Sequence, residues 1–346
     1  MSTNQGTGTG VLSVAPDGSS LFSTPLPLPP VPVLTSVPKS PFIIPLQQVS
    51  LGLMFFMTNT VVAPLERVHL LMQNQNEMIK SGCLSTPYKG MKDCFLRTIK
   101  QEGIISLWRG NCVNLCKALT SQAFAIAMYK NSWHNLGDNR NDEFGELKFK
   151  AAIFSATLFH YPLDYARTRV ATDFNYPMRV YHQFSLDSAR KDHFKVIRTR
   201  EFSGMFDVYR QTLLLNGITG LYKGYFLSFL EFLAWDYSNK KINQYSVTQE
   251  ATFTGMIMPN IALYSLPVVF YPLTSLSRRM MMNSSKASIR YKYAIHAFND
   301  IVKHEGLSSL YKGVTAGVTL CFARIFAFKA FAETSTIMMR SYFSQS

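Results

Sequence analysis

The chain has 346 residues, of which 47% are hydrophobic and 16% charged, and its formal net charge is +14. This charged share is well below the ~25% of ordinary soluble domains. The apolar residues are concentrated in runs that approach the ~20 residues needed to cross a bilayer. The composition therefore excludes an ordinary soluble domain and favours a helical membrane protein. Six such runs cover residues 48–62, 111–133, 149–161, 225–235, 252–271 and 314–331.

The basic residues are unevenly placed along the chain. Segments 66–110, 164–223 and 278–312 hold 24 of the 35 Lys and Arg but only 12 of the 21 acids. With six spans these three segments face the same side, and an excess of Lys and Arg in the loops of one side is typical of membrane proteins. We interpret the charge as a basic face over membrane lipid and predict no nucleic-acid partner.

The first 45 residues differ in composition from the rest. They contain nine of the 16 prolines, one lysine and no arginine. Proline-rich sequence of this kind favours polyproline II and cannot form a core of its own. We predict a separate N-terminal extension, residues 1–45, which is either a disordered tail or a segment that contacts partner proteins.

A proline motif occurs three times, at residues 63–69, 161–169 and 271–279. Proline removes a backbone donor and kinks a helix. In the middle copy Asp164 and Arg167 follow three residues apart, so they share one helical face. Charged side chains on a helix in lipid are tolerated where that face meets water or another helix. The sequence therefore predicts three kinked helices whose polar faces look inward.

A second pattern confirms a threefold repeat within the sequence. Gly90 and Gly110, Gly204 and Gly224, and Tyr293 and Gly313 are each 20 residues apart. Equal spacing in three places indicates homologous units. Amphipathic segments between the marks predict short helices on the membrane surface. We predict repeats at residues 46–140, 141–250 and 251–346, with an inserted loop near 175–200 that we expect to be solvated.

The sequence offers no pattern for an enzyme. It has no nucleophile paired with a base, no glycine-rich phosphate loop and no set of metal ligands. The five cysteines lack metal-site spacing, so we expect them to pack as small apolar groups. We predict no catalytic residue, no metal site and no enzymatic activity.

The repeat plan resembles the mitochondrial carrier family over about residues 46–340, and within it the ADP/ATP carriers. The matching stretches are 64–73, 108–111, 161–169 and 278–282. The resemblance implies an all-α membrane protein of six transmembrane helices in three pseudo-threefold repeats of about 100 residues. Each repeat would contain a kinked odd helix, a surface helix and an even helix. It also implies a multi-pass location in the mitochondrial inner membrane.

The resemblance further implies a gate on the matrix side, in which each kink carboxylate pairs with a cation of the next odd helix. Of the three pairs matched by position, we expect only the first to form an ion pair, either as a working gate or as a residual contact. Asp164 would lack its cation, and the third pair would lack both charges. The three pairs are Glu66 with Arg167, Asp164 with Ser277, and Thr274 with His69.

By the same resemblance, six residues belong to a substrate cavity. Lys117 would contact a nucleotide phosphate, snorkel, or pair with Asp164, and Glu231 would repel an anionic nucleotide. Cardiolipin, the one bound group that we expect, would be held at the glycine turns and the aromatic-basic-glycine marks. The cavity residues are Lys117, Arg169, Glu231, Phe232, Arg278 and Arg279. The lipid residues are Gly90, Trp108, Arg109, Gly110, Gly204, Tyr222, Lys223, Gly224, Tyr311, Lys312 and Gly313.

Two functions are compatible with this sequence. The lost gate charges favour a degenerate carrier that serves as a structural or accessory subunit of a respiratory-type inner-membrane assembly, contacting other subunits partly through residues 1–45. The alternative is an active transporter that exchanges ADP and ATP, or a related anion, across the inner membrane.

Overall fold

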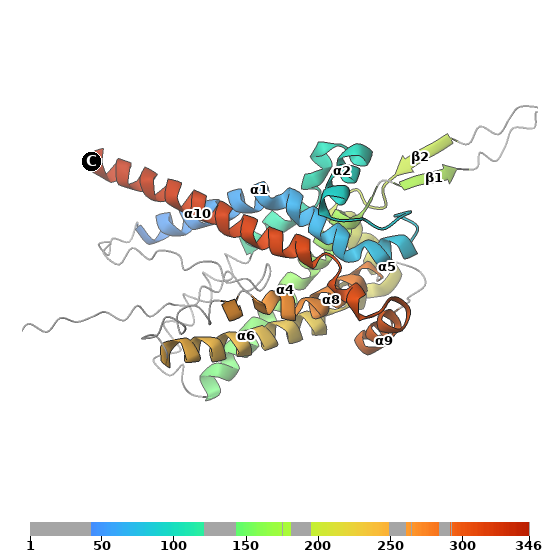
Figure 1. Ribbon diagram of the computed structural model, residues 1–346. Coiled ribbons are helices and arrows are strands. Elements are labelled where there is room, and N and C mark those ends of the chain that lie inside the picture. The colour runs from blue at the N-terminus through green and yellow to red at the C-terminus, as the bar shows by residue number, and fades with distance from the viewer. Residues whose placement is uncertain are drawn as a thin grey trace, which may run out of the picture.

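The computed structural model describes residues 43–120, 143–174, 176–180, 195–248, 261–263, 265–283, 291 and 293–345. Long helices form a bundle (Figure 1), and they match the predicted spans where these are described. The second span is helical at 111–120 and the fifth at 261–263 and 265–269, whereas residues 121–133 and 252–260 lie outside the described part. The helical fold class is therefore confirmed, whereas the repeat boundaries stay a prediction. The bundle helices are α1 (Ile43–Lys80), α4 (Glu143–Thr172), α6 (Tyr225–Thr248), α8 (Tyr271–Met282) and α10 (Val314–Gln345).

Shorter helices lie toward the end of the bundle opposite the C-terminus (Figure 1). They are α2 (Met91–Glu102) with the 3₁₀ turn η2 (Ile104–Trp108), α5 (Met205–Leu221), and α9 (Ala294–Glu305) with the 3₁₀ turn η3 (Leu307–Tyr311). The helices predicted between the marks of the first and third repeats are thus confirmed as α2 and α9. In α5 the helix is interrupted at Gly217, whose φ is 63° and ψ −166°, at the place where η2 and η3 begin in the other repeats.

Glycine conformation shows the threefold repeat directly. In each repeat two glycines seven residues apart have positive φ, a region that glycine enters without steric cost. The first ends the surface helix and the second precedes the next bundle helix. The pairs are Gly103 and Gly110, Gly217 and Gly224, and Gly306 and Gly313, with φ between 63° and 88°.

The second glycine of each pair also closes the ring of repeats. A Cβ on Gly110 would lie 3.2 Å from the Cβ of Ala171 on α4. A Cβ on Gly224 would lie 3.0 Å from the carbonyl oxygen of Ser277 on α8, and one on Gly313 would lie 3.0 Å from the backbone nitrogen of Gln73 on α1. Each repeat therefore packs its glycine against the odd helix of the next repeat, and the third packs against the first.

The proline motifs lie where kinks were predicted. Pro64 is inside α1 and Pro162 is inside α4. Pro272 is at the start of α8, just after Phe270, whose φ of −88° and ψ of 0° depart from the helix. In two repeats a tyrosine beside the proline secures the turn before the next helix. Tyr161 donates to the carbonyl of Lys223 at 2.6 Å, and Tyr271 donates to that of Lys312 at 3.0 Å.

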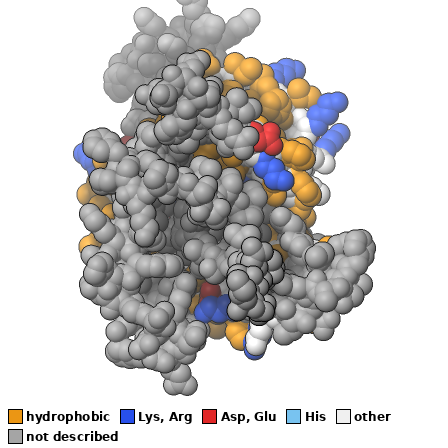
Figure 2. Space-filling model, turned by 90° about the vertical axis from the view of Figure 1, so that its left-hand side faces the viewer, with side chains coloured by type: hydrophobic (Ala, Val, Ile, Leu, Met, Phe, Trp, Pro, Cys, Tyr) orange, Lys and Arg blue, Asp and Glu red, His pale blue; other side chains and the backbone are white. Residues whose placement is uncertain are grey.

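Apolar packing also follows the repeat. Three buried clusters lie between the surface helices and the bundle, and large apolar side chains on the outside of the bundle are exposed, as lipid-facing residues are. Figure 2 looks at the molecule from the side on which the C-terminus lies in Figure 1. The described side chains at its upper right are mainly hydrophobic. By length and hydropathy alone, one described stretch, Leu307–Thr334, could cross a membrane. The clusters include Val68, Leu71 and Cys94; Tyr165, Phe202 and Val208; and Leu276, Tyr291 and Ile301.

The insertion corrects one expectation. Strands β1 (Tyr176–Val180) and β2 (Lys195–Thr199) pair as an antiparallel sheet, with Tyr176 opposite Thr199 and Val180 opposite Lys195. We expected a solvated loop here, because single-sequence reasoning detects a short hairpin poorly when the chain between its strands is long. The sheet extends beyond α2 (Figure 1), while the chain between the strands and residues 1–42 lie outside the described part.

Candidate functional site: the ionic closure of the bundle

Glu66 connects three bundle helices. Its carboxylate accepts hydrogen bonds from Arg167 on α4 and from Arg324 on α10, and both contacts are ion pairs. Asn114, in the helix at 111–120, donates to the same carboxylate at 3.0 Å. The predicted Glu66–Arg167 pair is therefore confirmed. Arg324 was not predicted to join it, because it lies 258 residues away along the chain.

Asp164 lacks a cation at the position of Ser277, as expected, but it pairs with Lys117, which was one of the three roles considered for that lysine. Lys117 Nζ lies 2.8 Å and 2.7 Å from the two carboxylate oxygens, and an Arg278 guanidinium nitrogen lies 3.8 Å from one of them. Lys117 is only 3% exposed, so it does not snorkel, and it forms the pair with Asp164; its contact with a nucleotide phosphate stays a prediction. The expected partner of Asp164, Ser277, instead bonds to the Ser228 hydroxyl at 2.8 Å and donates to the Gly224 carbonyl at 3.1 Å.

The third pair matched by position does not form. Thr274 donates to the carboxyl group of Glu231 on α6 at 2.5 Å. His69 Nδ1 lies 3.2 Å from the carbonyl oxygen of Gly313, at the start of α10. Both residues thus connect their helices to a neighbouring even helix. The predicted gate residues are brought into one layer of the bundle, but with rearranged partners.

The six predicted cavity residues divide into two groups. Lys117, Glu231 and Arg278 lie in this layer, with half-buried Phe232 following Glu231 on α6. Arg169 and Arg279 instead bind acids near the surface helices. Arg169 contacts Glu201 at 3.1 Å, and Arg279 contacts Glu305 at 2.7 Å.

Sequence reasoning missed a second layer of ion pairs, which lies beside the surface helices. Arg67 contacts Glu102 at 2.6 Å, so each odd helix has one arginine bound to an acid of the segment that follows it. A signal was present in the repeated Glu-Gly dipeptides at 102–103 and 305–306. The second repeat has Asn216 before its glycine, and there the arginine of the odd helix binds Glu201 instead.

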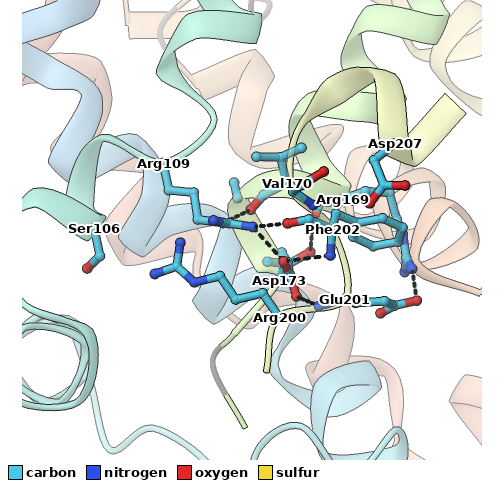
Figure 3. Close-up of polar contacts among 12 residues, drawn as sticks. Ser106, Arg109, Arg169, Val170, Asp173, Arg200, Glu201, Phe202 and Asp207 are labelled. Carbon is cyan, nitrogen blue, oxygen red and sulfur yellow. Dashed lines mark hydrogen bonds and ion pairs between the residues drawn. The ribbon is translucent and has the colours of Figure 1, made fainter. Parts of the chain in front are cut away.

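Figure 3 shows how the base of the insertion is attached to the bundle. The Asp173 carboxylate, just after α4, accepts from Arg109 at 2.5 Å and from the backbone nitrogens of Glu201 and Phe202 at 3.0 Å and 3.2 Å. Arg109 also donates to the carbonyl of Phe202 at 2.8 Å. These contacts connect repeat 1 to both ends of the insertion.

Replacing Asp173 by asparagine is expected to destabilise the protein by about 2–4 kcal/mol, since the carboxylate accepts three hydrogen bonds, one from a guanidinium. The measurement is the melting temperature of the full-length protein in mild detergent. Asp207→Asn is the matched control, because the half-buried Asp207 carboxylate accepts one backbone hydrogen bond, from Ser203 at 3.1 Å, and binds no guanidinium among the described residues. Equal melting temperatures for the two variants would contradict the role assigned to Asp173.

Glu305, on surface helix α9, gives a pH-dependent prediction. Burial alone would raise its pKa, but the hydrogen bond from Lys80 and the charge of Arg279 outweigh burial and lower the pKa to about 2. Its stabilisation is therefore present above the unfolded pKa of about 4.3 and is lost as the pH falls toward 2. We expect Glu305→Gln to cost about 1–3 kcal/mol at pH 7 and less at pH 3. A melting-temperature difference that is unchanged between the two pH values would refute this.

The predicted lipid residues lie at the starts of helices. Gly90 and Gly204 precede α2 and α5. Trp108 donates to the carbonyl of Thr60 at 2.9 Å, and Lys312 donates to Asn76 at 2.9 Å. The remaining predicted lipid residues lie in the turns just before the helices that begin at residues 111, 225 and 314. They are Arg109, Gly110, Tyr222, Lys223, Gly224, Tyr311 and Gly313.

Comparison with known proteins agrees with this architecture. The family model described as mitochondrial carrier protein matches residues 45–140 and 260–342. An ADP,ATP carrier protein of Gossypium hirsutum is 38% identical over 288 residues, covering 79% of this chain and 69% of its own length. One of Chlamydomonas reinhardtii is 34% identical over 303 residues, covering 83% and 92%. These relatives are carriers by name, in agreement with the prediction that the chain is not an enzyme. The chain belongs to the mitochondrial carrier family and is a multi-pass protein of the mitochondrial inner membrane.

Proposed function

We propose that this carrier exchanges adenine nucleotides, or a closely related anion, across the inner membrane. The observation that supports it best is the ionic layer around Glu66 and Asp164. Alternating access needs two closed states that differ by only a few kcal/mol. Ion pairs between helices can supply such a closure, because they can be exchanged for contacts with a charged solute.

The charge of this layer suits a polyanion. Four cations, Arg167, Arg324, Lys117 and Arg278, are held by two carboxylates. Phosphate groups would compete with Glu66 and Asp164 for these cations, and the guanidinium groups match phosphate oxygens in geometry. Substrate binding would thereby release the contacts between helices, which couples binding to opening. The named activity of the relatives makes ADP and ATP the first substrates to test.

The accessory-subunit hypothesis now has less support. It was based on gate residues that could not pair by position, and one of these, Asp164, pairs with Lys117. Glu66, which was expected to pair with Arg167, has a second cation in Arg324. Its remaining support is the proline-rich extension, residues 1–45. Native mass after mild detergent extraction separates the two hypotheses. We expect a monomer with detergent and lipid, and constant co-migration with a respiratory complex would favour the subunit.

We also propose an anionic lipid headgroup, such as that of cardiolipin, at the start of α6. Two of the three basic marks are engaged within the protein, because Arg109 binds Asp173 and Lys312 binds Asn76. The Lys223 ammonium has no hydrogen-bond partner among the described residues. It lies before the first turn of α6, where backbone donors and the helix dipole favour phosphate.

Nucleotide binding can be tested by the melting temperature of the purified carrier with ADP, ATP or adenosine. A ligand present at 100 times its Kd stabilises the folded state by about 2.7 kcal/mol. We expect ADP and ATP to raise the melting temperature, while uncharged adenosine leaves it unchanged. No shift with either nucleotide would contradict the proposed substrate class.

A further inference from the structure

One buried carboxyl group of the bundle differs from the other acids of its layer in its charge partners. Glu231 on α6 is 7% exposed, and its carboxyl group accepts a hydrogen bond from Thr274 at 2.5 Å. No described Lys or Arg forms an ion pair with it. Glu66 binds two guanidinium groups, and Asp164 binds Lys117 and Arg278. Glu231 is therefore the acid of this layer for which the described residues provide no counter-charge.

The charged groups that face Glu231 already form an ion pair with each other. They are Arg278 from α8 and Asp164 from α4, which lie 3.8 Å apart. Lys117, from the helix at 111–120, donates hydrogen bonds to both carboxylate oxygens of Asp164. The hydroxyl of Thr274 supplies one hydrogen bond but no charge. A buried carboxylate with no cation is costly, and such a group takes up a proton instead of remaining charged.

We propose that Glu231 is a proton-binding site that couples solute transport to pH. When the anionic solute enters the layer, its negative charge increases the proton affinity of Glu231 further, so a Glu231 carboxylate that is still ionised takes one proton from water and becomes neutral. When the solute leaves, the carboxyl group returns that proton to water. Neutral Glu231 removes the repulsion that its negative charge would exert on phosphate, so occupancy by solute and by proton favour each other. This inference rests on the proposed function.

The test is ADP exchange in proteoliposomes at pH 6, 7 and 8, with equal pH on both sides. We expect the wild-type rate to rise as the pH falls, by at most about tenfold per pH unit, because one proton is involved. Glu231→Gln keeps the acceptor for Thr274 but cannot titrate, so its rate should vary with pH only as far as the phosphate of ADP itself titrates. Glu231→Asp keeps a carboxyl group and should keep the dependence.

Asp236→Asn is the matched control on the same helix. Asp236 pairs with Lys240 at 3.1 Å, and its removal should leave the wild-type pH profile unchanged. Equal pH profiles for wild type and Glu231→Gln would overturn the proposal. So would a loss of ADP exchange in Glu231→Gln at every pH, because the negative charge would then be what the solute requires.

A measurement without solute separates this proposal from the proposed function. If no variant exchanges ADP, transport fails as the function, but the proton site can still be examined by melting temperature between pH 6 and 8. The wild type should lose stability relative to Glu231→Gln as the pH rises, because it must then hold an unpaired charge. Parallel curves would refute the proton site.

Discussion

Replacing Glu66 by glutamine is expected to destabilise the carrier by about 3–5 kcal/mol, the cost of leaving buried charges without their partner. Glu66 is 4% exposed and is the carboxylate for both Arg167 and Arg324, so its neutralisation leaves two guanidinium groups facing each other. The three residues belong to α1, α4 and α10, so the loss weakens the contact between the first and last repeats. The melting temperature of the full-length protein in detergent measures it.

Two further variants make this test specific. Arg324→Leu removes one cation but leaves Glu66 with Arg167 and Asn114, so its cost should be clearly smaller. Asp93→Asn removes a half-exposed pair with Arg97 on α2, for which we expect a change of no more than about 1 kcal/mol. If Glu66→Gln is no worse than Asp93→Asn, then Glu66 does not hold the helices together.

The second large effect is expected at Lys117 and Asp164. Lys117→Met leaves the half-buried Asp164 with Arg278 at 3.8 Å. Asp164→Asn leaves the Lys117 ammonium, 3% exposed, without a carboxylate. Each single change should cost about 2–4 kcal/mol, because a buried charge loses its partner. The double variant removes both charges and should be less unstable than the sum, with a coupling of about 1–3 kcal/mol.

The four melting temperatures of this cycle are the measurement. The same cycle on Asp236 and Lys240, a more exposed pair on α6, should give a coupling below about 1 kcal/mol. Additive effects of Lys117→Met and Asp164→Asn would mean that the two residues do not form the contact that replaces the missing cation at Ser277.

The architecture could be predicted from the sequence because local patterns determine it. Proline at 64, 162 and 272 and the spacing of 20 residues that ends at Gly110, Gly224 and Gly313 recur in three places, and each recurrence has a local physical cause. The positive φ of Gly110, Gly224 and Gly313 is such a cause. The Glu66–Arg167 pair was also predictable, because it joins two copies of one motif.

The rearranged partners could not be predicted, because they depend on how whole helices are rotated against each other. Arg324 reaches Glu66 across 258 residues of sequence, and no local pattern encodes this contact. Lys117 had three possible roles by sequence, and only the packing of its helix against α4 shows that it pairs with Asp164. The hydroxyl contact of Ser228 with Ser277 likewise follows from the close approach at Gly224. Because of these contacts, we interpret the layer as a gate whose charges have found new partners and no longer as a gate that has lost them.

The central claim is that the re-paired bundle still transports. The most direct test is the initial rate of labelled ADP uptake into liposomes that contain the purified full-length carrier, with and without ATP inside. We predict uptake that is several times faster with internal ATP and absent from protein-free liposomes. Uptake no faster than in protein-free liposomes, by a protein that melts cooperatively, would contradict the account and favour the accessory subunit.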